Sequence, residues 1–197
     1  MLEAMQQNWL LFLVYFVALS LLPVSDAYFM RTYGKDKKIR RVVDRRSLKI
    51  FRLAVAAGLT VGVLAFLFRI APIGLETRFI ACLALPLILG GIVLRSAAIV
   101  TLGRSFTANI EVSEDQKIVT QGPYRTIRHP AYAGLLITLL GWGLTFENWI
   151  AVISLFGFAL AAILFRIRIE EAALKSAFGS SYTDYMKRTK ALVPFVV

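Results

Sequence analysis

The chain has 197 residues, of which 58% are hydrophobic, and its mean hydropathy is +0.68. Soluble domains are about 45–50% apolar, so the composition excludes an ordinary soluble domain. It predicts an all-α integral membrane protein with one domain over residues 1–197. The net charge of +11 does not indicate a nucleic-acid partner, because the basic residues flank apolar segments and no recognition module surrounds them. One cysteine leaves too few ligands for a Cys/His metal cluster.

Five apolar segments are expected to be transmembrane helices, at residues 8–29, 50–68, 78–102, 131–146 and 149–165. Residues 31–52, between the first two, include ten Lys or Arg. Such a loop stays in the cytoplasm, where it also meets anionic membrane lipids. The N-terminus is therefore predicted to lie outside. The polar loop after the third span and the C-terminal tail then share the cytoplasmic face.

The third span contains Arg95, about seven residues or roughly 10 Å from its cytoplasmic end. One interpretation is an arginine that reaches back to the membrane surface. The other is a cation that faces a polar cavity, since charges inside a membrane usually mark functional sites. The sequence leaves both open.

The polar loop that follows alternates weakly in hydropathy between Phe106 and Val119. This pattern predicts a short extended stretch or a hairpin around Glu114 and Asp115. Long structured loops in compact proteins are often functional. The loop is therefore a candidate part of a site.

Residues 122–134 form a polar, turn-rich island before the fourth span and contain the only histidine, His129. Pro130 suits the first turn of a helix, so part of the island has a structural purpose. The neighbouring Tyr124, Arg128 and Tyr132 nevertheless favour a polar ligand site, because pockets often combine such groups at a helix mouth. Histidine also titrates near physiological pH.

Glu170 and Glu171 follow the last predicted span. One interpretation is structural, with acids favoured at a helix N-terminus or bridged to the neighbouring arginines, and the other is a pair of carboxylates that bind a ligand. Gly179 is expected to end one helix before a second, amphipathic one begins. No G-x-G-x-x-G or P-loop fingerprint is present.

Several of these motifs together resemble the isoprenylcysteine carboxyl methyltransferase family of integral membrane methyltransferases. They are Gly122-Pro123-Tyr124, Arg128-His129-Pro130-x-Tyr132, the helical hairpin, Glu170-Glu171 and Phe178-Gly179-x-x-Tyr182-x-x-Tyr185. The resemblance covers residues 103–194, whereas the first two spans carry no signature.

The resemblance implies an enzyme that uses S-adenosylmethionine at the cytoplasmic side, enclosed by residues 103–134 and 166–190. A lipophilic, prenylated acceptor would be methylated on its carboxylate. The cofactor contacts that it implies are Gln121, Tyr124, His129, Pro130, Tyr132, Glu170 and Glu171. Orientation of the acceptor carboxylate is expected from Arg95, Arg128 or Arg168.

The acceptor stays open at this level. Related membrane methyltransferases act on lipid amines or small thiols, and the motif region also resembles membrane sterol reductases. A non-enzymatic alternative is a membrane scaffold that binds anionic lipid through residues 31–52. That alternative leaves the island around His129 and the paired glutamates unexplained.

Overall fold

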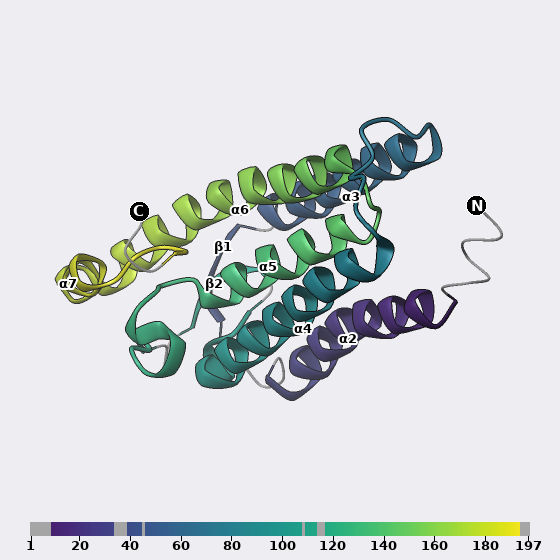
Figure 1. Cartoon of the computed structure of the whole chain (residues 1–197). Coiled ribbons are helices and arrows are strands. Elements are labelled where there is room, and N and C mark those ends of the chain that lie inside the picture. The colour runs from purple at the N-terminus through teal and green to yellow at the C-terminus, as the bar shows by residue number, and fades with distance from the viewer. Residues whose placement is uncertain (1–8, 34–38, 45, 108, 114–116, 194–197) are drawn as a thin grey trace.

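The computed structural model describes residues 9–33, 39–44, 46–107, 109–113 and 117–193. They form an all-α bundle with one small sheet (Figure 1). The long helices are α2 (Trp9–Tyr33), α3 (Arg46–Leu67), α4 (Thr77–Leu102), α5 (Pro130–Leu144) and α6 (Trp149–Phe178). Shorter elements are α7 (Ser180–Arg188), the 3-10 turns η1 (Gly103–Ser105) and η2 (Gly122–Arg125), and the strands β1 (Ile39–Asp44) and β2 (Ile110–Ser113).

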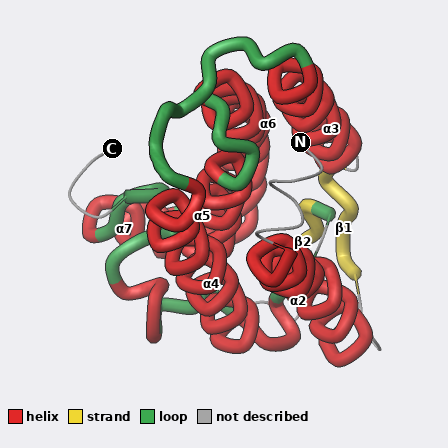
Figure 2. The backbone as a smooth tube through the Cα atoms, turned by 45° about the vertical axis from the view of Figure 1, so that its right-hand side comes forward, coloured by secondary structure: helices red, strands yellow, loops and turns green. Residues whose placement is uncertain are grey.

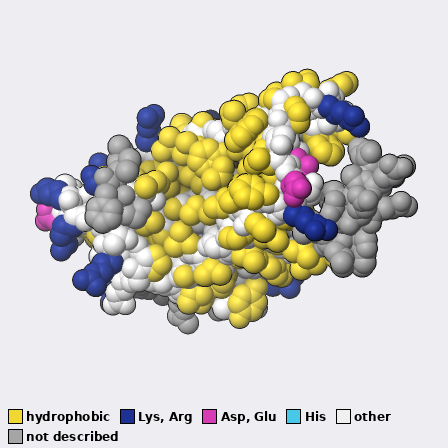
Figure 3. All heavy atoms as spheres, in the orientation of Figure 1, with side chains coloured by type: hydrophobic (Ala, Val, Ile, Leu, Met, Phe, Trp, Pro, Cys, Tyr) yellow, Lys and Arg dark blue, Asp and Glu magenta, His cyan; other side chains and the backbone are white. Residues whose placement is uncertain are grey.

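Four of the helices, α2, α3, α4 and α6, are long and apolar enough to cross a membrane. An apolar band covers the middle of the molecule, with charged side chains towards its two ends (Figure 3). These features confirm the predicted class of integral membrane protein. The predicted number of five spans is not confirmed, because α5 has 15 residues and rises only about 22 Å, less than the roughly 30 Å hydrocarbon core.

The last predicted span does not end at residue 165, and its helix instead runs on to the break predicted at Gly179. Helix α6 continues for 30 residues to Phe178, and Gly179 follows it with a positive φ of 56°. The sequence from Arg166 to Phe178 contains no helix breaker, so the charged residues extend the helix rather than end it. Glu170 and Glu171 therefore lie inside α6, and the interpretation that they mark a helix N-terminus is wrong.

The predicted extended stretch exists as β2, and its partner comes from the basic loop. Strand β1 pairs with it in antiparallel fashion, with Val42 opposite Glu111. The alternative hairpin turn at Glu114 and Asp115 lies outside the described residues. At the end of β1 the Asp44 carboxylate accepts hydrogen bonds from the backbone N–H groups of Arg46 and Ser47, at 2.8 and 2.9 Å. This carboxylate caps the start of α3.

The closest helix packing joins α4 to α5. Both helices present glycine at the contact, and a Cβ atom at Gly91 would lie 2.5 Å from the carbonyl oxygen of Gly134. Helix α3 packs on α6 in a similar way, through Gly58 against Ser154. Helix α2 lies against α4, on the side of the bundle opposite α3 and α6 (Figure 2). Small residues let membrane helices approach closely, and this approach brings α4 beside the first turn of α5.

The Gly91 contact predicts a steep difference between two adjacent glycines. Gly91→Ala forces α4 and α5 apart, so we expect a loss of about 1–3 kcal/mol in stability, as for other overpacked sites. Gly90 has nothing within 4 Å of its Cβ position, so Gly90→Ala should cost nothing. Thermal unfolding of both variants in detergent measures the difference. Equal melting temperatures would contradict the packing described here.

Candidate active site

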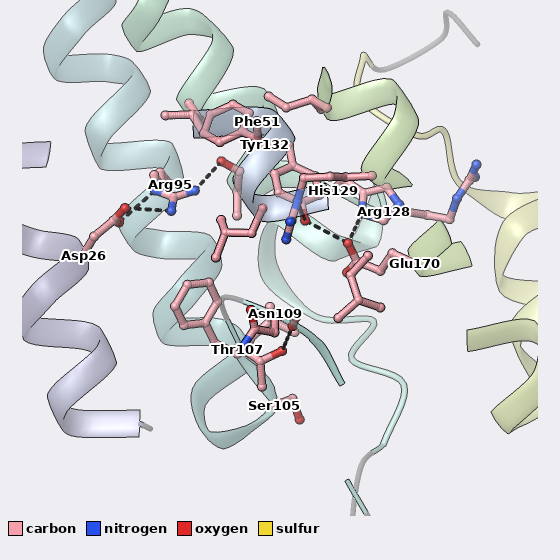
Figure 4. Close-up of a pocket in the computed structure, with 18 of the residues that line it drawn as sticks. Asp26, Phe51, Arg95, Ser105, Thr107, Asn109, Arg128, His129, Tyr132 and Glu170 are labelled. Carbon is pink, nitrogen blue, oxygen red and sulfur yellow. Dashed lines mark hydrogen bonds and ion pairs between the residues drawn. The ribbon is translucent and has the colours of Figure 1, made fainter. Parts of the chain in front are cut away.

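One cavity of about 610 Å³ lies at the end of the bundle where α5 begins. Side chains from helices α2 to α7 and from the loop before α5 line it. Its volume falls within the roughly 300–1,000 Å³ range of small-molecule sites. Arg95 and Asp26 lie on one side of the cavity, and Arg128, His129 and Glu170 lie on the other (Figure 4).

The backbone of the segment around His129 is held by the C-terminal segment after α7. The N–H of Arg128 donates to the carbonyl of Lys190 at 2.7 Å, and the N–H of His129 donates to Ala191 at 3.0 Å. Pro130 is buried at the first position of α5, where its missing N–H costs nothing. The backbone of Arg128 and His129 is therefore fixed, and their side chains point towards α6.

A cluster of charged and aromatic groups fills the space between α5 and α6. The Arg128 Nε donates to Glu171 Oε1 at 2.7 Å, and His129 Nε2 lies 3.3 Å from the same oxygen. The Tyr132 hydroxyl donates to Glu170 Oε2 at 3.0 Å, and its ring stacks on His129. Consecutive residues on a helix point about 100° apart, which is why the two glutamates serve different partners.

Arg128 is committed to structural contacts. Besides Glu171, its Nη1 donates to the carbonyls of Met186 and Thr189 at the end of α7. The guanidinium thus ties α5, α6 and α7 together. Charge-assisted bonds of this kind are the strong ones in proteins, so we regard Arg128 as the clamp of this end of the bundle.

Arg95 faces the cavity, which decides between the two interpretations that the sequence left open. The residue is 9% exposed. Its Nε and Nη2 donate to the two carboxylate oxygens of Asp26, both at 2.9 Å, and Nη1 donates to the carbonyl of Ala131 at 3.1 Å. The arginine therefore turns inward to protein partners instead of reaching to the membrane surface.

Arg166 is a second buried cation that lines the cavity. Its Nη1 donates to Ser47 Oγ at 2.9 Å, and its guanidinium lies 5.9 Å from the centre of the Tyr132 ring. This contact links the start of α3 to α6, because Ser47 is fully buried there. Helix α3 thereby joins the site through Ser47.

Three tyrosines outside the long helices also line the cavity. The Tyr185 hydroxyl donates to the carbonyl of Tyr124 at 2.7 Å, and Tyr182 lies beside Tyr185. Burial raises the pKa of Tyr185 to about 12, and it raises the pKa of Tyr124 and Tyr182 further in the same direction. All three phenols are therefore neutral near pH 7 and offer aromatic faces and hydroxyl groups.

The cavity also has an apolar part. It runs towards the middle of the bundle, where the lining residues are Leu22, Phe51, Val55, Leu135, Leu139, Trp142 and Ile163. Its sides at α2 and α3 include the exposed Met30 and Arg52. The cavity thus opens to the surface between α2 and α3.

The structure brings most of the predicted site residues together. Those that line the cavity are Arg95, Tyr124, Arg128, His129, Tyr132 and Glu170. Glu171 supports two of them, whereas Gln121 and Arg168 are exposed and do not line it.

Sequence reasoning missed Asp26, Arg166, Tyr182 and Tyr185 as lining residues. A signal existed for Asp26, because it is an isolated acid in an apolar segment. For the two tyrosines the signal was their helical spacing, which places both on one face of α7.

Fold and site together define a helical membrane protein with a polar ligand cavity built from helix ends. The sequence pattern of the isoprenylcysteine carboxyl methyltransferase (ICMT) family matches residues 83–176. The predicted resemblance to this family is thereby confirmed.

Named relatives agree with that match. The chain is 41% identical over 123 residues to protein-S-isoprenylcysteine O-methyltransferase B of Arabidopsis thaliana, covering 60% of this chain and 61% of the relative. It is 33% identical over 126 residues to the Tribolium castaneum protein-S-isoprenylcysteine O-methyltransferase, covering 61% and 44%. The chain thus spans less than two thirds of the length of these relatives.

A solved structure of the eukaryotic intramembrane Ras methyltransferase ICMT is also similar. Its TM-score is 0.55 and its sequence identity 28%, over 78% of this chain and 55% of that one. The family implies S-adenosylmethionine as methyl donor.

The contacts of Arg128 predict a structural effect. Arg128→Lys cannot reproduce the planar fork that bonds Glu171 and the end of α7, so we expect a loss of about 1–3 kcal/mol in stability, the usual cost of leaving a buried hydrogen-bonding group without its partner. Thermal unfolding and proteolysis of α7 measure it. Arg125→Lys is the matched control, because Arg125 is exposed in the same segment. Equal stability of the two variants would contradict the clamp.

Proposed function

We propose that the protein is an S-adenosylmethionine-dependent membrane methyltransferase that methylates the carboxylate of an isoprenylcysteine-like lipophilic acceptor. The observation that carries the proposal is the composition of the single cavity described above. A charged end at His129 and Glu170 adjoins an apolar part that opens between α2 and α3. A polar cofactor and a lipidic acceptor need these two environments side by side.

The charged end has the groups that the cofactor requires. Glu170, whose carboxylate borders the cavity, would bind the ammonium of the methionine part. His129 would bind its carboxylate, and Glu171 holds the imidazole in place. The faces of Tyr124 and Tyr132 suit the adenine and the sulfonium, since aromatic faces attract cations. Pro130 shapes the turn, and Gln121 lies at its exposed edge.

When bound, the cofactor supplies an activated methyl group. A carboxylate acceptor is already ionised near neutral pH, so the protein needs no strong base. The residues instead orient the acceptor and exclude water, and proximity can supply up to roughly 7–11 kcal/mol of barrier reduction. The lipophilic part of the acceptor would lie along Leu139, Trp142 and Phe51 in the apolar part.

Arg95 is the best of the three predicted arginines for orienting the acceptor. Arg168 is exposed and does not line the cavity, and Arg128 uses its Nη1 for two carbonyls at the end of α7. Arg95 makes only one bond from each nitrogen to the described residues, which leaves an N–H on both terminal nitrogens for a carboxylate. Arg95 lines the cavity on the side opposite His129 and Glu170, and its guanidinium is suited to a carboxylate. We therefore assign the acceptor carboxylate to Arg95.

The orientation in the membrane follows from the basic residues near β1. Arg31, Arg46, Lys49 and Arg52 flank the ends of α2 and α3 that border the cavity. Cytoplasmic loops carry an excess of such residues. We place the cavity at the cytoplasmic face and the N-terminus outside.

The first test is cofactor binding. We expect the detergent-purified protein to bind S-adenosylmethionine and S-adenosylhomocysteine, and His129→Ala and Glu170→Gln to weaken binding by about tenfold or more, which corresponds to about 1.4 kcal/mol. Isothermal titration calorimetry measures the affinities. Asp184→Asn is the control, because this carboxylate is exposed on α7. A folded wild-type protein that binds neither ligand would contradict the methyltransferase proposal.

The second test separates the two roles. Arg95→Lys should lower turnover with an S-farnesylcysteine acceptor by about tenfold to 100-fold, because a lysine cannot make the bidentate contact that sets its position. Its affinity for S-adenosylhomocysteine should stay within about twofold, since Arg95 has no assigned cofactor contact. A tenfold loss of affinity would require the loss of about 1.4 kcal/mol of binding free energy. Methyl transfer from labelled cofactor measures turnover, with thiol and lipid-amine acceptors as parallel arms. Methylation of only those acceptors would contradict the assignment of a carboxylate.

A further inference from the structure

Helix α2 meets α4 along one stripe of side chains. Tyr15 packs on Ala81 and Ala84, Ala18 packs on Ile88 and Ile92, and Phe29 packs on Ala98 and Ile99. With Leu22 and residue 26, which lie between Ala18 and Phe29, these positions of α2 recur at intervals of three or four, as one face of a helix requires. The stripe therefore fixes α2 against α4 over most of its described length.

Asp26 lies in the same stripe, three residues before Phe29 and four after Leu22. Its carboxylate grips Arg95 with two parallel hydrogen bonds of 2.9 Å, from Nε and Nη2. A third bond, from Nη1 to the carbonyl of Ala131, ties the guanidinium to the first turn of α5. Arg95 is thus held from two helices at once.

Stability alone does not account for this ion pair. The Arg95 side chain is buried and that of Asp26 is partly buried, with exposures of 11% and 34%. Burying a charge costs much of what the pairing gains, and apolar residues of similar size are often as stabilising or more so. The neighbouring positions of the stripe are apolar, so the packing of α2 on α4 does not need a charge. The pair stands instead where both partners line the cavity.

We propose that Asp26 is a positioning residue for the reaction. It locks the rotamer of Arg95 by occupying the Nε/Nη2 edge of the guanidinium, so that the remaining N–H groups stay aligned for the acceptor carboxylate. The proposal rests on the function assigned above to Arg95. It also gives the first long helix, which lies outside the matched residues 83–176, a part in the active site.

The test compares Asp26→Asn and Asp26→Glu with the wild type. Asn keeps the shape but removes the charge and the bidentate grip, so turnover with S-farnesylcysteine should fall by about tenfold to 100-fold, the scale expected for a misplacement of about 1 Å. Glu keeps the charge pair but shifts it, so its turnover should lie between that of Asn and the wild type. The affinity of both variants for S-adenosylhomocysteine should stay within about twofold of the wild type, because Asp26 is assigned no cofactor contact. A tenfold loss of affinity would require the loss of about 1.4 kcal/mol of binding free energy.

Turnover is expressed per S-adenosylhomocysteine-binding site, so that a lower yield of folded protein does not count as a lower rate. Tyr15→Ala is the control, since it loosens the same α2 to α4 contact far from the cavity and should keep turnover per site within about twofold. A general loosening of α2 would slow Tyr15→Ala as much as Asp26→Asn and would overturn the proposal. Wild-type turnover per site in Asp26→Glu and in every folded Asp26→Asn sample would also overturn it.

Measurements on the wild-type protein distinguish the positioning role of Asp26 from the proposed methyltransferase function on which it rests. An S-adenosylhomocysteine-binding wild type that methylates no carboxylate acceptor contradicts the proposed function. An active wild type with unaffected Asp26 variants contradicts only the positioning role. If Asp26→Asn does not fold, Asp26→Glu decides the question, because it retains a carboxylate to pair with Arg95.

Discussion

Buried charged side chains must find their partners within the protein, because burial removes them from water. This constraint organises the whole cavity. Arg95 pairs with Asp26, Arg128 pairs with Glu171, and Arg166 donates to Ser47. Each contact joins two elements that are distant in the sequence, so satisfying the charges also sets the arrangement of the helices around the site.

The partners come from every part of the chain. The segment after α7 binds the backbone on either side of Arg128, and the basic loop supplies β1, which pairs with the loop before α5. A cavity built in this way needs no soluble domain. Its groups are preorganised because their hydrogen bonds are already made before a ligand arrives, and preorganised dipoles and charges are what a reaction in a water-poor site requires.

The same arrangement separates two phases within one cavity. The charged end lies by the loops and α7, and the apolar part lies between helices that face the membrane. Under the proposed function, a cofactor with several charges and an acceptor with a lipid chain would approach from different sides. In the proposed reaction, methyl transfer would depend on alignment, which the fixed position of Arg95 in the cavity wall would provide.

The sequence by itself determined the class of the protein and most of its site. Long apolar segments can only be membrane helices when their backbone must be satisfied internally, and the island around His129 was legible because polar residues are conspicuous between such segments. The strand β2 and the break at Gly179 were also predictable from local pattern. Local signals of this kind act over a few residues and need no knowledge of the fold.

Only the tertiary structure decided which charges share a cavity. Arg95 could have reached the membrane surface or turned inward, and the outcome depended on Asp26, 69 residues away, and on the close approach of Gly91 to Gly134. The continuation of α6 past Arg166 likewise placed Glu170 and Glu171 beside α5 rather than at a helix end. Which charged groups pair depends on how distant helices pack together, and a pattern of hydropathy along the sequence does not predict that packing.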